Sequence, residues 1–165
     1  MADQKKSKIA QERDEDVRGL WRWLAPRFDA RRLVFVDESG FHTSMIVDGA
    51  TDSEAFEAYV EHFLAPTLRS GQVVVLDGLG AHRTEKVREL VEERGADLVF
   101  LPSYSPDLNP IEVAFSKIKA LVRKEGARVR EALVEAIGRA LATVTPEDAA
   151  GWFAHAGYWP HDQPL

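Results

Sequence analysis

The sequence contains no cysteine, which excludes a disulfide framework, a thiolate zinc site and a cysteine nucleophile. Any metal ion must therefore be held by oxygen or imidazole ligands. No apolar run approaches the ~20 residues of a membrane-spanning helix, and runs such as LVFV at 33–36 are typical of the longest. The opening MADQKKSK is not followed by the apolar stretch of a secretory signal. These absences predict a soluble cytoplasmic protein with no membrane partner.

An excess of positive charge is also missing. The chain has 21 lysines and arginines against 27 aspartates and glutamates, a net charge of −6, which is the wrong sign for a typical nucleic-acid-binding domain. One stretch differs, because between 117 and 130 a single acid, Glu125, stands among six bases. This run predicts either a solvated helix face or a surface that follows DNA phosphates. The candidates for nucleic-acid binding are Lys117, Lys119, Arg123 and Lys124.

The 165 residues and the hydrophobic content of 45% suit one domain with a real core. Residues 1–30 are expected to form a charged leader followed by a short helix, and the main domain is expected at 31–160. In that helix Val17, Leu20, Trp21 and Leu24 recur at helical spacing, so they are predicted to form its buried face, and Pro26 is predicted to end it.

Three short runs predict strands buried on both faces: LVFV at 33–36, VVVL at 73–76 and LVFL at 98–101. Helices are predicted between and after them, which makes an α/β fold with parallel pairing as the default. Their starts are marked by a capping-box pattern from Thr51 to Glu54 and by caps at Thr84, Asn109 and Thr145. Their predicted buried stripes are, in chain order, Phe56, Tyr59, Val60, Phe63 and Leu64; Val87, Leu90 and Val91; Ile111, Phe115, Ile118 and Val122; and Val129, Leu133, Ile137 and Leu141.

Two of the predicted strands run directly into an acid, LVFV into Asp37 and VVVL into Asp77. The ligand crevice of an open α/β sheet lies at the carboxyl ends of its strands, so adjacent parallel strands would bring both acids to one rim. Two close carboxylates with few histidines nearby favour Mg²⁺ or Mn²⁺, ions that suit phosphate substrates. The alternative is that each aspartate only caps the loop that follows it.

A third acid, Glu112, stands in the first turn predicted after the Asn109 cap, in the segment FLPSYSPDLNPIEVAFSKIKALV. A glutamate at this position can reach back to the amide of the cap residue and benefit from the helix dipole, which would be a purely structural role. The spacing of Glu112 from Asn109 fits this structural role as well as a role as a metal ligand.

The strings VFVDESGFH, VVVLDGLGAH and LPSYSPDLNPIEVAFSKIKA resemble the three catalytic blocks of the DDE endonuclease domain of bacterial insertion-sequence transposases, in the mariner superfamily. Thirty-four residues separate Asp77 from Glu112, which agrees with the interval in that family. The likeness runs from about Leu33 to Tyr158. It implies an RNase H-like fold, with a three-layer arrangement of a mixed sheet flanked by helices.

The resemblance also implies a function. Asp37, Asp77 and Glu112 would hold two Mg²⁺ or Mn²⁺ ions and catalyse DNA strand cleavage and strand transfer in transposition. The implied partners are the DNA of the transposon ends and of the target, with no small-molecule substrate, in a bacterial cytoplasm near the nucleoid. Asn109 is expected only to shape the turn that presents Glu112.

The chain departs from this family in one respect. Only 39 residues separate Asp37 from Asp77, so at most one short strand, at Met45–Val47, fits where the family has two more. The chain is therefore expected to be internally shortened near 44–45, which would leave a sheet edge open for a homodimer. No helix-turn-helix precedes the domain in this sequence, so the element that normally finds the transposon ends is expected to be missing from it, whether it was lost or is supplied separately.

Two other functions compete with an active transposase. The first is a catalytically inactive remnant that acts at most as a DNA-binding or dimerisation module. The second is a phospho-acceptor domain of the receiver type. A receiver needs a lysine at the end of a later strand, and LVFLPSYSP offers none.

Overall fold

The computed structural model describes residues 14–37, 53–77, 83–126 and 129–161. Its centre is a parallel sheet in the order β1-β2-β3, in which Leu33 pairs with Val73 and Val73 with Asp97. The strands are β1 (Leu33–Val36), β2 (Val73–Leu76) and β3 (Asp97–Phe100). The first two coincide with the predicted strands, and the third begins one residue early.

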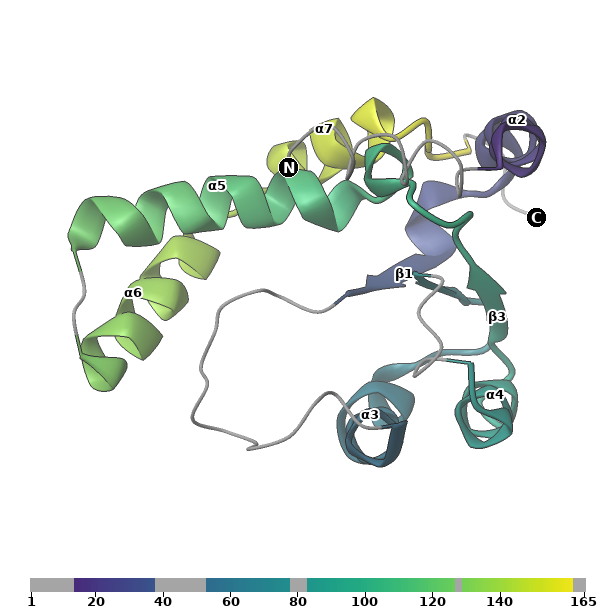
Figure 1. Cartoon of the computed structure of the whole chain (residues 1–165), viewed down its shortest axis with the longest axis horizontal. Helices are drawn as coiled ribbons and strands as arrows, with labels where there is room; N and C mark the ends of the chain where they lie inside the picture. The colour runs from purple at the N-terminus through teal and green to yellow at the C-terminus, as the bar shows by residue number, and fades with distance from the viewer. Residues whose placement is uncertain (1–13, 38–52, 78–82, 127–128, 162–165) are drawn as a thin grey trace, which may run out of the picture.

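Helices cover both faces of the sheet (Figure 1), with α3 and α4 on one side and α2, α5 and α7 on the other. Helix α6 packs along α5, away from the sheet. The α-helices are α2 (Glu15–Leu24), α3 (Ser53–Tyr59), α4 (Glu85–Glu92), α5 (Pro110–Glu125), α6 (Arg130–Ala142) and α7 (Pro146–His155). The shorter turns are η1 (Ala25–Arg27), η2 (Ala30–Arg32), the π-helical η3 (Val60–Leu64), η4 (Ala65–Thr67) and η6 (Pro106–Leu108).

The strands are apolar on both faces because each face has its own core. Odd-numbered residues such as Val73 and Val75 pack with Trp21, Leu108 and Tyr158 under α2 and α7. The even-numbered residues of β2 pack on the other face with side chains of α3, η3 and α4. Burial on both sides accounts for the continuous apolar runs, and it makes β2 the most buried strand.

The predicted helix starts at Thr84, Asn109 and Thr145 are confirmed. Each side-chain oxygen accepts a hydrogen bond from a backbone amide in the first turn, and Thr145 forms a reciprocal capping box with Asp148. Helix α5 ends at Gly126, whose φ of 64° is a left-handed conformation that favours glycine. The ends of α5 are thus set by local sequence.

Several predicted buried faces are wrong. On α2, Val17 and Leu20 are exposed, and the buried face consists of Arg18 and Trp21. The prediction of buried faces uses the spacing of apolar residues alone. It therefore misses a charged residue that is buried against a partner far away in the sequence. Four other members of the predicted stripes are also exposed: Tyr59, Phe63, Val129 and Leu141. Only the i, i+4, i+8 row of Phe56, Val60 and Leu64 reaches the sheet from α3 and η3.

Some predictions fall outside the described residues. These are the strand at Met45–Val47, the shortening near 44–45, residues 1–13 of the leader and the cap at Thr51. Within the described part, all strand pairs of the sheet are parallel, and β1 has a partner on one side only, β2. None of the helices described there combines the length and apolar character that crossing a bilayer requires.

Candidate active site

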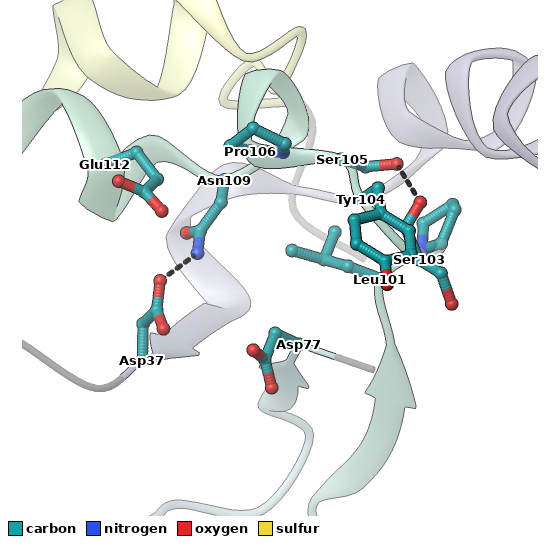
Figure 2. Close-up of a pocket in the computed structure, with 10 residues that line it drawn as sticks. Asp37, Asp77, Leu101, Ser103, Tyr104, Ser105, Pro106, Asn109 and Glu112 are labelled. Carbon is teal, nitrogen blue, oxygen red and sulfur yellow. Dashed lines mark hydrogen bonds between the residues drawn. The ribbon is translucent and has the colours of Figure 1, made fainter. Parts of the chain in front are cut away.

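Asp37, Asp77 and Glu112 line one pocket of about 320 Å³. Asp37 directly follows β1, Asp77 directly follows β2, and Glu112 lies in the first turn of α5. Figure 2 shows the three acidic side chains around one space beside the carboxyl ends of β1 and β2. Parallel pairing of β1 with β2 brings the two aspartates to one edge, and α5 supplies the third acid from above it.

Of the structural role predicted as an alternative for Glu112, the capping box is not seen. The amide of Asn109 donates to the carbonyl of Pro106 (3.1 Å), so it does not complete a capping box with Glu112. The Glu112 side chain is exposed and lines the pocket. Its position on the first turn still benefits from the positive end of the helix dipole.

Asn109 lies between two of the acidic positions. Its side-chain amide Nδ2 donates to Asp37 Oδ2 (2.8 Å), and its Oδ1 accepts from the amide of Ile111 (3.2 Å). The residue is only 4% exposed. Sequence reasoning expected Asn109 to cap α5 and to shape the turn that presents Glu112, because nothing in the local pattern indicates contact with a residue 72 positions away.

The loop between β3 and α5 forms the rest of the pocket wall. Its lining residues run from Leu101 to Pro106, and the Leu101 amide donates to the Leu76 carbonyl, which continues the sheet ladder into the loop. Tyr104 has a φ of 54°, a conformation that is uncommon for a bulky residue and that often marks functional loops. The loop therefore holds its pocket-lining side chains in one specific turn.

Helix α2 is attached to this loop by buried polar contacts. Arg18 is fully buried, and its guanidinium donates to both carboxylate oxygens of Asp107 (3.0 and 2.8 Å) and to the Ser105 hydroxyl. One turn later, Trp21 Nε1 donates to the Tyr158 hydroxyl, which donates to the Leu108 carbonyl, both at 2.8 Å. These contacts fix the loop that precedes Asn109.

The Arg18–Asp107 contact also changes proton affinities. The pKa of Asp107 is lowered, mainly because Arg18 donates hydrogen bonds to its ionised form, against an opposing effect of burial. On the other side, burial raises the pKa of Tyr158 well above its ordinary value, so this hydroxyl stays protonated and can donate. Sequence reasoning did not identify Arg18 or Tyr158 as residues that support the loop. The only signal for Arg18 was its helical spacing from Trp21.

The basic residues of α5 divide between two faces. Lys117 makes an ion pair with Asp148 of α7 (2.6 Å), and this contact lowers the pKa of Asp148. Lys119 and Arg123 follow Glu112 at i+7 and i+11, which places them on the helix face that begins at the pocket. Arg123 and Lys124 are exposed in the last turn. The run is therefore not one uniform surface.

The part of the chain that the structure describes contains no cluster of three or more histidine, cysteine, aspartate or glutamate side chains arranged as a complete metal site. The pocket nevertheless contains carboxylate oxygens, the donors that hard divalent ions prefer, on Asp37, Asp77 and Glu112.

A parallel α/β sheet with two aspartates at the carboxyl ends of its strands and a glutamate on the first turn of α5 defines an acid-lined site of the kind used for phosphate chemistry. The chain belongs to the DDE superfamily endonucleases, whose family model matches residues 29–134. The resemblance read from the three sequence blocks is thereby confirmed. The Transposable element Tcb2 transposase of Caenorhabditis briggsae is 33% identical over 81 residues, which are 47% of this chain and 30% of that protein. The chain thus corresponds to less than a third of this relative's length.

Proposed function

We propose that this chain is the catalytic domain of a DDE-type transposase that cleaves DNA strands and transfers them in the transposition of a bacterial insertion sequence. The observation that carries the proposal is that Asp37, Asp77 and Glu112, from three separate elements, line one pocket. Membership of the DDE endonucleases and likeness to a transposase support it. The proposal includes an RNase H-like domain over 31–160, preceded by the leader and helix of 1–30, and a cytoplasmic location near the nucleoid.

In this proposal Asp37, Asp77 and Glu112 hold Mg²⁺ or Mn²⁺. When bound, such ions supply an activated hydroxyl nucleophile and stabilise the leaving oxygen during displacement at phosphorus. The contribution of the chain is to place three carboxylates on rigid elements, two at strand ends and one on a capped helix. The loop from Leu101 to Asn109 then forms the wall against which a scissile phosphate would lie.

The first test is metal binding. We expect calorimetric titration with Mn²⁺ to show binding by the wild-type chain and a loss of at least tenfold in affinity for Glu112→Gln, because the amide keeps the shape of the side chain but removes its charge. Glu147→Gln, the same change in the first turn of α7, is the matched control and should bind Mn²⁺ as the wild type does. Equal affinity for the wild type and Glu112→Gln would contradict the proposed ligand set.

DNA is the proposed partner, and Lys117, Lys119, Arg123 and Lys124 are the proposed contacts. The face that carries Lys119 and Arg123 starts at Glu112, so a strand that leaves the pocket along it would meet these charges about 10 and 16 Å away, at 1.5 Å per residue. Lys117 already neutralises Asp148, which makes it the weakest of the four candidates. We therefore place the backbone of the bound DNA mainly along the Lys119–Arg123 face.

We expect the double change Lys119→Ala and Arg123→Ala to weaken DNA binding and to lower the slope of log affinity against log salt by about 2, because two phosphate contacts are lost. Arg123→Ala and Lys124→Ala form a matched pair of adjacent, exposed cations on different faces. Fluorescence anisotropy across a salt series should show the larger loss for Arg123→Ala. Equal losses would mean that DNA follows the whole basic run.

A second candidate function, a catalytically inactive module that binds DNA or dimerises, is favoured by one observation. In the described residues β1 is paired with β2 alone, and this candidate assigns its other side to pairing with a second copy. This candidate expects a stable homodimer and no dependence on divalent ions. The Mn²⁺ titration described above separates the two functions.

A further inference from the structure

The side chain of Asn109 joins one acidic residue, Asp37, to the first turn of α5, which carries Glu112. Its Nδ2 donates to Asp37 Oδ2 at 2.8 Å, and its Oδ1 accepts from the amide of Ile111, the residue next to Glu112. Both ends of this planar amide are therefore engaged, and the residue is 4% exposed. The acid that follows β1 and the first turn of α5 are linked through one buried group.

We infer that Asn109 is a positioning residue, which sets the direction of the Asp37 carboxylate relative to Glu112. The inference rests on the proposed function, because it assigns Asn109 a role in the metal site proposed there. Asp37 stands at the end of a strand that, in the described residues, has a partner on one side only. A hydrogen bond from a capped helix restrains a carboxylate that the sheet alone holds less firmly.

The chemistry of the amide explains why asparagine suits this position. Serine, aspartate and asparagine cap helices about equally well, so capping alone does not require asparagine. Among these three, only asparagine carries an acceptor for the Ile111 amide together with an N–H that can reach a carboxylate. The amide is also neutral, so it orients Asp37 without the positive charge by which an arginine or lysine would compete with a metal ion.

The test separates the two roles of the side chain. Asn109→Ser keeps the capping oxygen and removes the donor to Asp37, whereas Asn109→Ala removes both. For Asn109→Ser we expect Mn²⁺ affinity to fall about tenfold and the rate of DNA nicking to fall by ~10- to 100-fold, with little change in the KM for DNA. Its melting temperature should fall only by the small amount that one lost hydrogen bond costs, while Asn109→Ala should lose a further ~2–4 °C.

Thr145→Ala is the matched control, because it removes a cap from α7, away from the pocket. It should lower the melting temperature as Asn109→Ala does and leave Mn²⁺ affinity and nicking unchanged. A purely structural role for Asn109 would make the three variants lose activity only in proportion to stability. Wild-type Mn²⁺ affinity and nicking in Asn109→Ser would overturn the inference.

A double-mutant cycle keeps the inference separate from the proposed function. Asn109→Ser and Asp37→Ala, alone and together, are compared by urea unfolding without metal or DNA, and we expect their shifts in midpoint to be non-additive. Additive shifts would overturn the inference even if the wild type nicks DNA. Non-additive shifts in a chain that neither binds Mn²⁺ nor nicks DNA would support the link between Asn109 and Asp37 and refute the proposed function.

Discussion

Replacing Asp77 with asparagine is expected to abolish DNA nicking, with a fall in rate of about three orders of magnitude. Asp77 follows the fully buried strand β2, so its carboxylate has the most rigid support of the three acids. The amide retains the size of the side chain and removes the charge that would hold a divalent ion. A share of about 4 kcal/mol in transition-state stabilisation corresponds to roughly a thousandfold in rate.

The assay for this prediction is the conversion of supercoiled plasmid to open circles in Mg²⁺, with and without chelator. Asp97→Asn is the matched control, because Asp97 begins β3 and therefore lies at the opposite end of the sheet from the pocket. It should nick DNA at the wild-type rate. If Asp77→Asn retained wild-type activity, the nicking would have to arise from another site or from another protein in the sample.

Although Asp77→Asn is expected to abolish nicking, it should raise the stability of the metal-free chain. Three carboxylates that share one pocket repel one another without a cation, so removing one charge should raise the melting temperature of the metal-free chain. Added Mg²⁺ should stabilise the wild type, since it binds the folded state, and it should have little effect on Asp77→Asn. This crossover in melting temperature reports on the site independently of any DNA substrate.

Much of the framework that positions the site could be predicted from the sequence, because local patterns determine it. The runs that end at Val36 and Leu76 are strands as predicted, and each is followed by an acid at the pocket. The cap at Asn109 fixes where α5 begins and hence where Glu112 lies. Strand burial and helix capping are local signals, so they can be read without knowledge of tertiary contacts.

The contacts that orient the site could not be predicted in this way. The bond from Asn109 to Asp37 spans 72 positions, and the bonds from Arg18 to Asp107 span 89. A single sequence does not indicate which distant polar groups will meet. The same gap explains the wrong face of α2, where apolar periodicity favoured Val17 and Leu20 and the folded chain buries Arg18.

Removing the Arg18 side chain is expected to give the largest loss of stability of the changes considered. Arg18→Ala deletes a fully buried guanidinium that makes two hydrogen bonds to Asp107 and one to Ser105, and it leaves a cavity in its place. Asp107 is about half exposed and can regain water, so the cost should be below that of breaking a fully buried pair. We expect a loss of about 2–4 kcal/mol in urea unfolding.

Arg22→Ala is the control for this change. Arg22 lies one turn later, is half exposed, and also contacts Asp107 (3.3 Å), so its loss should cost less than about 1 kcal/mol. Arg18→Lys should recover only part of the stability, because an ammonium group cannot reproduce the paired bonds. Equal effects of Arg18→Ala and Arg22→Ala would mean that the buried contact adds no more stability than a surface ion pair.

The stabilisation from Arg18 should also depend on pH in a known direction. Arg18 lowers the pKa of Asp107 in the folded state, so this stabilisation is complete above the ordinary carboxyl value of about 3.9 and is lost as the pH falls through the lowered pKa. The difference in unfolding free energy between the wild type and Arg18→Ala should therefore be constant at neutral pH and shrink below about pH 4.

Because Ser105 and Asp107 lead into Asn109, Arg18→Ala should also nick DNA more slowly than the wild type at neutral pH, at temperatures where it remains folded. A stable loop with unchanged nicking in Arg18→Ala would show that α2 has no part in orienting the site.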